Sequence, residues 1–168
     1  MIFPPILIYI TPWLLYAVWS DVKERKVSNK FIILFLIFSL VIVLKLYGFS
    51  ALSILALSFF VTFLLMIPTF LLRILGGGDI KLILVLSLYL SWLQSCEFII
   101  YSFCWGALFG LIKTGLDRRL NLLFFDTLSL IKKQKNTDTN SNPIPFTVAI
   151  MLGFYSEVVA LALGVSIL

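Results

Sequence analysis

The sequence predicts an all-α, polytopic membrane protein in which a single domain, residues 1–168, contains six transmembrane helices. Of its residues, 61% are hydrophobic and only 12% are charged, and the mean hydropathy is +1.11. A soluble domain of this length has no core large enough to bury so much apolar surface. The apolar stretches are continuous rather than alternating, which excludes a β-barrel, and helices satisfy their own backbone polar groups in lipid.

Six apolar stretches are long enough to cross a bilayer at about twenty residues per helix. They cover approximately residues 2–20, 31–47, 50–75, 80–95, 97–116 and 144–168. No basic segment precedes the first stretch and no small-residue cleavage site follows it, so we expect a retained span rather than a signal peptide. Pro68 interrupts the third stretch and predicts a kink near the membrane midplane.

The distribution of basic residues predicts how the chain lies in the cytoplasmic (inner) membrane. Twelve of the thirteen Lys and Arg residues fall in or beside the first, third and fifth connections, and Lys45 is the exception. The positive-inside rule places these three connections in the cytoplasm and both termini outside. The net charge of +5 therefore indicates orientation in a lipid membrane rather than binding to nucleic acid.

The fifth connection has two parts. Residues 119–133 carry apolar side chains at helical spacing, with basic residues at both ends. This pattern predicts a helix that lies in the membrane interface. Residues 136–142 are polar and rich in turn-forming types, which predicts a loop before the last span.

Metal and haem ligands are scarce in this chain. It contains no His, and its two Cys, Cys96 and Cys104, do not form a Cys-x-x-Cys pair. We therefore expect no zinc site and no cofactor. The two thiols are best explained as small packing residues.

Asp79 is the first candidate functional residue, because an acidic side chain at the edge of the hydrocarbon layer is energetically costly. Residues 76–81 read Gly-Gly-Gly-Asp-Ile-Lys. In one interpretation, the glycines end the third span and Asp79 is the N-cap of the fourth. Capping does not explain three consecutive glycines, which would let the backbone unwind and another chain approach closely.

Asp21 is the second candidate. By itself it could be a solvated loop charge, with Asn29 as a cap of the second span. The predicted orientation, however, places Asp21 and Asp79 on the same side of the membrane. Two carboxyl groups in a poorly hydrated site cannot both ionise easily, so one of them keeps a proton. The ionised group can then activate water while the protonated one donates to a carbonyl oxygen, which is suited to peptide hydrolysis without a metal.

Both aspartates lie in segments that resemble a known family. Residues 76–81 match the Gly-x-Gly-Asp-x-Lys motif of the type IV prepilin peptidases, which are aspartic proteases of the membrane. Residues 21–29 resemble the first aspartate motif of that family, with Val27 in place of Ile and Ser28 in place of Pro. A Ser at this position can still cap a helix. Residues 143–146 are similar to the Pro-Phe segment that opens the last helix of the family, so the resemblance covers nearly the whole chain.

The resemblance implies an aspartic endopeptidase that removes the short basic leader from prepilin-like membrane proteins (pilin, pseudopilin, Flp-type or preflagellin-like precursors). Asp21 and Asp79 would be its catalytic residues. A second group would shape the backbone next to the substrate: Gly76, Gly77, Gly78, Lys81 and Asn29. The chain lacks the two Cys-x-x-Cys pairs of longer members. It resembles the short branch of the tight-adherence and preflagellin systems, and no N-methyltransferase activity is expected.

Two other classes of function stay open at this point. A small transporter or channel could use the aspartates as ion ligands or proton relays, although the sequence shows no inverted repeat. A non-catalytic pilus or secretion assembly protein could keep the same fold.

Lys45 and Glu157 are two further charges that lie within predicted spans. Each lies about 20 Å from the cytoplasmic start of its helix at 1.5 Å per residue, which suggests an ion pair between them in the outer half of the bundle. In the alternative interpretation, Lys45 extends to the outer membrane surface and Glu157 lines a hydrated crevice.

Overall fold

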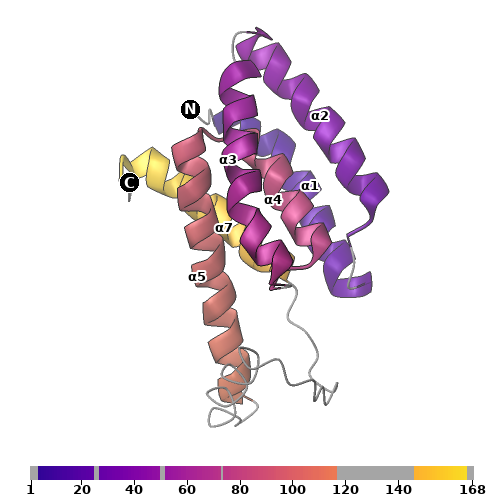
Figure 1. The fold of residues 1–168 in the computed structure, drawn as a ribbon, viewed down its shortest axis with the longest axis vertical. Helices are drawn as coiled ribbons and strands as arrows, with labels where there is room; N and C mark the ends of the chain where they lie inside the picture. Colours follow the sequence, from indigo (N-terminus) through magenta and orange to yellow (C-terminus); the bar gives the residue numbers. More distant parts are fainter. Residues whose placement is uncertain (1–3, 25–26, 50–51, 73, 117–145, 166–168) are drawn as a thin grey trace.

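The computed structural model describes residues 4–24, 27–49, 52–72, 74–116 and 146–165. These residues form helices and the turns between them, with no strand among them (Figure 1). The helices are α1 (Pro4–Glu24), α2 (Asn29–Tyr47), α3 (Leu52–Leu71), α4 (Gly77–Ser87), α5 (Trp92–Leu116) and α7 (Phe146–Leu163). The predicted all-helical fold class is thus confirmed for this part of the chain. The interfacial helix expected at residues 119–133 lies outside the described residues.

Four of these helices, α2, α3, α5 and α7, are long and apolar enough to cross a membrane. Neither α1 nor α4 belongs to this group, so the prediction of six spans is not confirmed. α4 has 11 residues, which gives a length of about 16 Å, roughly half of the ~30 Å hydrocarbon layer.

The predicted boundary between the fourth and fifth spans is wrong. α4 ends at Ser87, and α5 begins at Trp92 after a short turn. The backbone N–H of Ser91 donates to Gln94 Oε1 at 3.0 Å, and the Gln94 N–H donates to Ser91 Oγ at 3.4 Å. This reciprocal cap fixes the start of α5. Pro68 lies in the last turn of α3, so it is not at the middle of a spanning helix, where the midplane kink was predicted.

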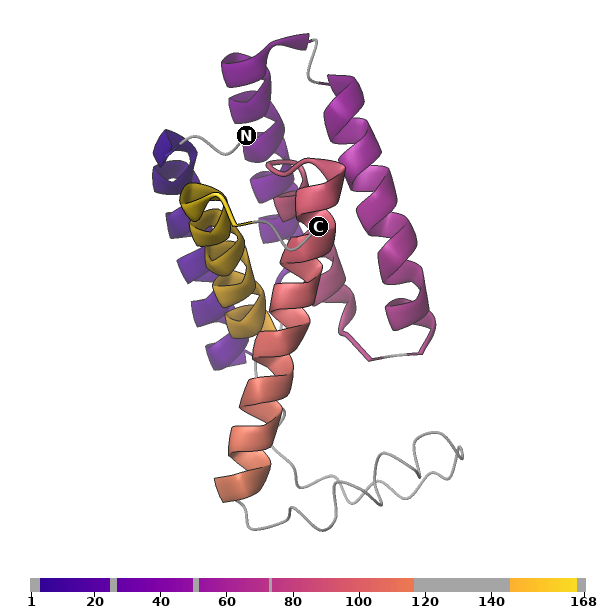
Figure 2. The same ribbon diagram turned by 90° about the vertical axis from the view of Figure 1, so that its left-hand side faces the viewer.

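α4 is the central helix of the bundle. It packs against α2, α3, α5 and α7, and the two ribbon views show it enclosed by them (Figures 1 and 2). Leu82, Ile83, Val85 and Leu86 are each at most 1% exposed. A helix that is apolar around its whole circumference is stable when other helices cover it. The surrounding protein, rather than lipid, therefore holds the N-terminal end of α4 in place.

α5 and α7 make a close contact at Gly153. A Cβ atom at this position would lie 2.7 Å from the backbone of Ser102 on α5, so only glycine lets the two helices approach this closely. α7 also packs against α1 (Figure 2). The first turn of α7 is thereby placed next to the last turn of α1.

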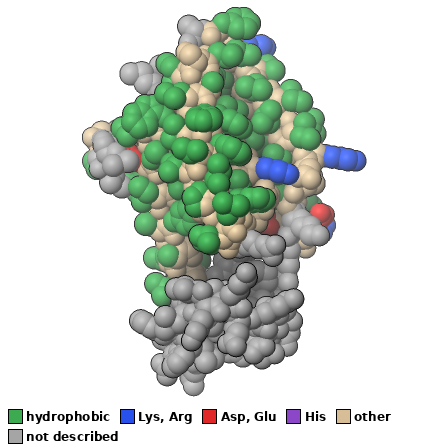
Figure 3. Space-filling model, in the orientation of Figure 1, with side chains coloured by type: hydrophobic (Ala, Val, Ile, Leu, Met, Phe, Trp, Pro, Cys, Tyr) green, Lys and Arg blue, Asp and Glu red, His purple; other side chains and the backbone are tan. Residues whose placement is uncertain are grey.

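The face of the bundle that Figure 3 shows is mostly apolar. On α2, Ile33 and Ile37 are 59% and 53% exposed, and on α3, Phe60 and Leu64 are 61% and 57% exposed. Such a surface is unfavourable in water and is expected where helices face lipid. Together with the four apolar helices, it indicates a membrane protein.

The predicted ion pair between Lys45 and Glu157 is wrong. Glu157 is fully buried and interacts with Glu97 of α5, whereas Lys45 is exposed near the end of α2. Lys45 and Glu157 lie at similar depths along their helices, but their side chains do not face each other.

Candidate active site

The N-terminal end of α4 holds the carboxyl group of Asp79. Gly76 is the N-cap, with φ −67° and ψ 147°, and Gly77 and Gly78 already belong to the first turn. Asp79 is the third helical residue, and its carboxylate accepts a hydrogen bond from the Gly76 backbone N–H. Asp79 is therefore not the N-cap that the sequence suggested. It supplies the acidic half of a capping box, where the helix dipole favours a negative charge.

The three glycines differ in what they make possible. A Cβ at Gly76 would lie 3.1 Å from Asp79 Oδ2, so the missing side chain gives the carboxylate its room. A Cβ at Gly77 would meet nothing within 4 Å, and one at Gly78 would make an ordinary contact with Val27 at 3.7 Å. The backbone does not unwind at Gly77 and Gly78, because both are helical.

Asp21 lies in the last turn of α1 and is half-buried, so it is not a solvated loop charge. Thr147 Oγ1 donates a hydrogen bond of 2.6 Å to Asp21 Oδ2. Thr147 is fully buried in the first turn of α7. Thr147 was not among the site residues predicted from the sequence. The only feature of the sequence that could have indicated it is a hydroxyl side chain directly after the Pro-Phe segment that opens the last span.

The structure brings the two aspartates together at one end of the bundle, where α1 ends and α4 and α7 begin (Figure 1). Burial is the largest effect on the Asp79 carboxyl group and raises its pKa, the nearby Asp21 carboxylate raises it as well, and the hydrogen bond from Gly76 lowers it; together they move the pKa from 3.8 to about 6. These are the physical effects expected of two carboxyl groups that share a poorly hydrated site.

Asn29 and Lys81 join α2 to α4 at the same end. Lys81 Nζ donates a hydrogen bond of 2.8 Å to Asn29 Oδ1. Asn29 does not cap α2, because Ser28 is the N-cap and its Oγ accepts a hydrogen bond from the Phe31 N–H at 3.2 Å. The Ser in place of the family's Pro thus has a capping role.

The arrangement allows general acid–base chemistry at neutral pH. One carboxyl group has a pKa near 6 and the other accepts a hydrogen bond from a buried hydroxyl, so the pair can hold one proton between them. Within the described residues, no group of three or more His, Cys, Asp or Glu side chains could hold a metal ion.

The fold and the site together define a membrane-type helical bundle with two interacting carboxyl groups at one end. The model of the type IV leader peptidase family matches residues 8–111, which is more than half of the chain, and the chain belongs to this family. The matched region contains both aspartates and the whole of residues 76–81, but not Thr147. Comparisons with curated proteins and with solved structures gave no match.

Proposed function

We propose that the chain is an aspartic endopeptidase that removes the short basic leader from prepilin-like precursors at the cytoplasmic face of the membrane. The observation that carries this proposal is the interacting pair of Asp21 and Asp79 at one end of the bundle. Membership of the type IV leader peptidase family supports peptide cleavage in general. The basic residues of the connections at this end support a cytoplasmic location.

The pair supplies both proton transfers that hydrolysis needs. The ionised carboxylate takes a proton from water, and the oxygen of that water forms a bond with the carbonyl carbon of the substrate. The protonated carboxyl group donates to the carbonyl oxygen. In the second step the C–N bond breaks as the C=O bond re-forms, and the proton taken from water passes to the departing amine nitrogen. A hydroxyl group of the intermediate returns a proton to the carboxylate that had donated one, which restores the pair. Asp79, with its pKa near 6, is the better candidate for the initial acid, and Asp21, held by Thr147, for the base.

Acid-to-amide substitutions test this mechanism. We expect Asp21→Asn and Asp79→Asn each to abolish the size shift of a leader-bearing prepilin-like precursor that is co-expressed with the chain. Glu24→Gln is the matched control, because Glu24 is an exposed carboxyl group one turn from Asp21. Mass spectrometry of the product should show an unmethylated new N-terminus.

The same experiment separates the peptidase from an assembly protein or a transporter. Those classes do not cut the precursor, or leave its processing unchanged when either aspartate becomes Asn. Full processing by a membrane-inserted Asp79→Asn chain would exclude the proposed mechanism.

A further inference from the structure

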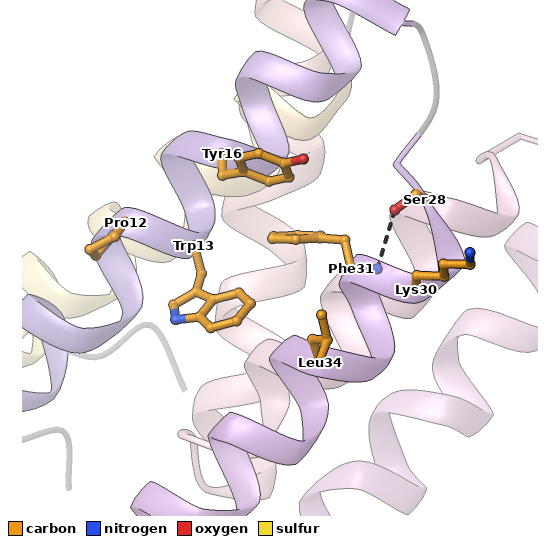
Figure 4. Close-up of a pocket in the computed structure, with 7 residues that line it drawn as sticks. All are labelled: Pro12, Trp13, Tyr16, Ser28, Lys30, Phe31 and Leu34. Carbon is orange, nitrogen blue, oxygen red and sulfur yellow. Dashed lines mark hydrogen bonds between the residues drawn. The ribbon is translucent and has the colours of Figure 1, made fainter.

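α1, which carries Asp21 in its last turn, is supported by α7. The two helices pack against each other, whereas α1 and α2 are not among the closely packed helix pairs. An open groove of about 490 Å³ lies between α1 and α2 and is lined by side chains of both (Figure 4). Hydrogen bonds join α1 to α7, between the hydroxyls of Thr11 and Tyr155 at 2.7 Å and from Thr147 to Asp21 at 2.6 Å. The position of Asp21 therefore depends on where α7 lies.

The first residue of α7, Phe146, packs directly on a glycine of α5. A Cβ at Gly106 would lie 2.5 Å from Cε2 and 3.2 Å from Cδ2 of the Phe146 ring, so the ring occupies the space where a side chain would otherwise be. Phe103, one turn earlier on α5, contacts the same ring at a centroid distance of 6.0 Å. Gly106 and Phe103 thus form a notch that holds the ring, at the place where α5 runs past the start of α7 (Figure 2).

The notch is connected to the active site through Thr147, which follows Phe146 in the chain. Thr147 is fully buried, and its Oγ1 donates the hydrogen bond to Asp21 Oδ2. Both residues belong to the first turn of α7, whose backbone N–H groups have no intrahelical partners. Side-chain contacts with neighbouring helices are therefore needed to fix this turn. A shift of the ring out of the notch would move the Thr147 hydroxyl away from Asp21.

We propose that Phe146 is a positioning residue of the active site and that Gly106 makes room for its ring. The ring in the notch sets the place of the Thr147 hydroxyl, and the hydroxyl orients the Asp21 carboxylate that serves as the base. The inference rests on the proposed function for its effect on catalysis. Because Phe146 and Gly106 act on the carboxyl pair rather than on the substrate, their substitution should change kcat and leave KM unchanged.

An exchange of bulk between the two positions tests the notch. Gly106→Ala places a methyl group where the ring lies, and Phe146→Leu removes the outer atoms of the ring. Each should lower kcat for a prepilin-like precursor about five-fold or more, with KM unchanged, and the double variant should recover most of the loss because the methyl group then has space. Gly110→Ala is the matched control one turn further along α5, since a Cβ there meets nothing within 4 Å. A double variant that loses the product of the two single losses would overturn the inference.

A chain without the hydroxyl separates positioning from packing alone. In a Thr147→Val background, Gly106→Ala should lower kcat by less than about two-fold, because the hydrogen bond that it displaces is already absent. Its effect on the unfolding temperature in detergent should be the same in both backgrounds. If Gly106→Ala lowers kcat equally with and without the Thr147 hydroxyl, Phe146 does not act through Thr147 and the inference fails.

Crosslinking checks the geometry without any substrate. In a chain whose two native cysteines are replaced by Ala, Asp21→Cys and Thr147→Cys should be joined by a short bis-methanethiosulfonate reagent. Gly106→Ala should lower the yield about three-fold or more, and Phe146→Leu added to it should restore the yield. An unchanged yield in Gly106→Ala would overturn the inference. If the yields change as expected but the wild-type chain cuts no precursor, the proposed function fails, whereas the placement of Thr147 by Phe146 is upheld.

Discussion

Asp21 and Asp79 are held by hydrogen-bond donors of different kinds. Asp21 accepts from the hydroxyl of Thr147, which arrives from the other end of the sequence on α7. Asp79 accepts from the backbone of its own helix cap, Gly76. A backbone donor is fixed by the helix geometry, whereas the hydroxyl is present only if α7 is correctly seated. The geometry of the pair is therefore most sensitive to the residue at position 147.

Removal of the Thr147 hydroxyl should weaken catalysis without preventing folding. Thr147→Val keeps the shape of the side chain and removes the donor to Asp21 Oδ2. Hydrogen bonds to charged groups contribute about 1.5–3 kcal/mol, so we expect kcat/KM to fall by about 10–100-fold in a peptide-cleavage assay. Thr147→Ser keeps the hydroxyl and should keep most of the activity. Equal activity of the Val and Ser variants would contradict a role for this hydrogen bond.

The pKa of Asp79 predicts the pH dependence of activity. Because this pKa is raised to about 6, the pair loses its shared proton as the pH rises through this value. We expect kcat/KM for a soluble leader peptide to decline above about pH 6, with the apparent pKa belonging to the pair. A rate that stays constant from pH 5 to pH 9 would exclude a protonated carboxyl group as the general acid.

The same pKa predicts how stability changes with pH. A raised pKa means that the folded protein binds the Asp79 proton more tightly than the unfolded chain does, so the free energy of unfolding falls as the pH rises from about 4 to about 6. Asp79→Asn removes this effect. Its unfolding temperature in detergent should exceed that of the wild type at pH 7.5, by the equivalent of about 1–3 kcal/mol, and the difference should disappear near pH 4. A difference that grows toward pH 4 would contradict the raised pKa.

At the scale of helices, α7 links the packing of the bundle to the site. Its glycine contact with α5 and its contact with α1 fix the position of its first turn, which carries Thr147. A change in the α5–α7 contact should therefore alter both stability and catalysis.

Gly153→Ala tests this link. The added Cβ would meet the Ser102 backbone at 2.7 Å, and overpacking of this kind costs about 1–3 kcal/mol. We expect a lower unfolding temperature in detergent together with a lower kcat/KM. Gly110→Ala is the matched control on α5, since a Cβ there meets nothing within 4 Å and alanine favours the helix. If Gly153→Ala is as stable as Gly110→Ala, the close contact with α5 does not fix the position of α7.

The helices show how far the sequence could predict this structure. Apolar runs and basic connections predicted an all-helical membrane protein with Asp21 and Asp79 at the same end. Hydropathy could not separate α4 from α5, because the apolar run continues through the turn. The Ser91-x-x-Gln94 capping box, which marks the start of α5, was the sequence signal for this boundary. The pairing of Lys45 with Glu157 failed because depth along a helix does not determine which side of the helix a residue faces. Thr147 was missed because its contact with Asp21 joins segments 126 residues apart.

At the scale of the whole molecule, the proposed function requires that the aspartate end of the bundle faces the cytoplasm. The two ends of α2 provide markers for this orientation. Glu24 lies in the last turn of α1, next to the start of α2, and Phe49 follows the other end of α2 and is 85% exposed. Both side chains are exposed, so a cysteine at either position should not disturb the bundle.

Cysteine labelling at these positions tests the orientation. In a chain whose Cys96 and Cys104 are replaced by Ala, Phe49→Cys should react with a membrane-impermeant maleimide added to intact cells, whereas Glu24→Cys should react only in inverted membrane vesicles. The physical reason is the positive-inside rule, because the basic residues gather on the aspartate side. Labelling of Glu24→Cys in intact cells would place the aspartates outside the cytoplasm. The chain would then have to meet its substrate after the basic leader has crossed the membrane, a costly step for a segment rich in Lys and Arg.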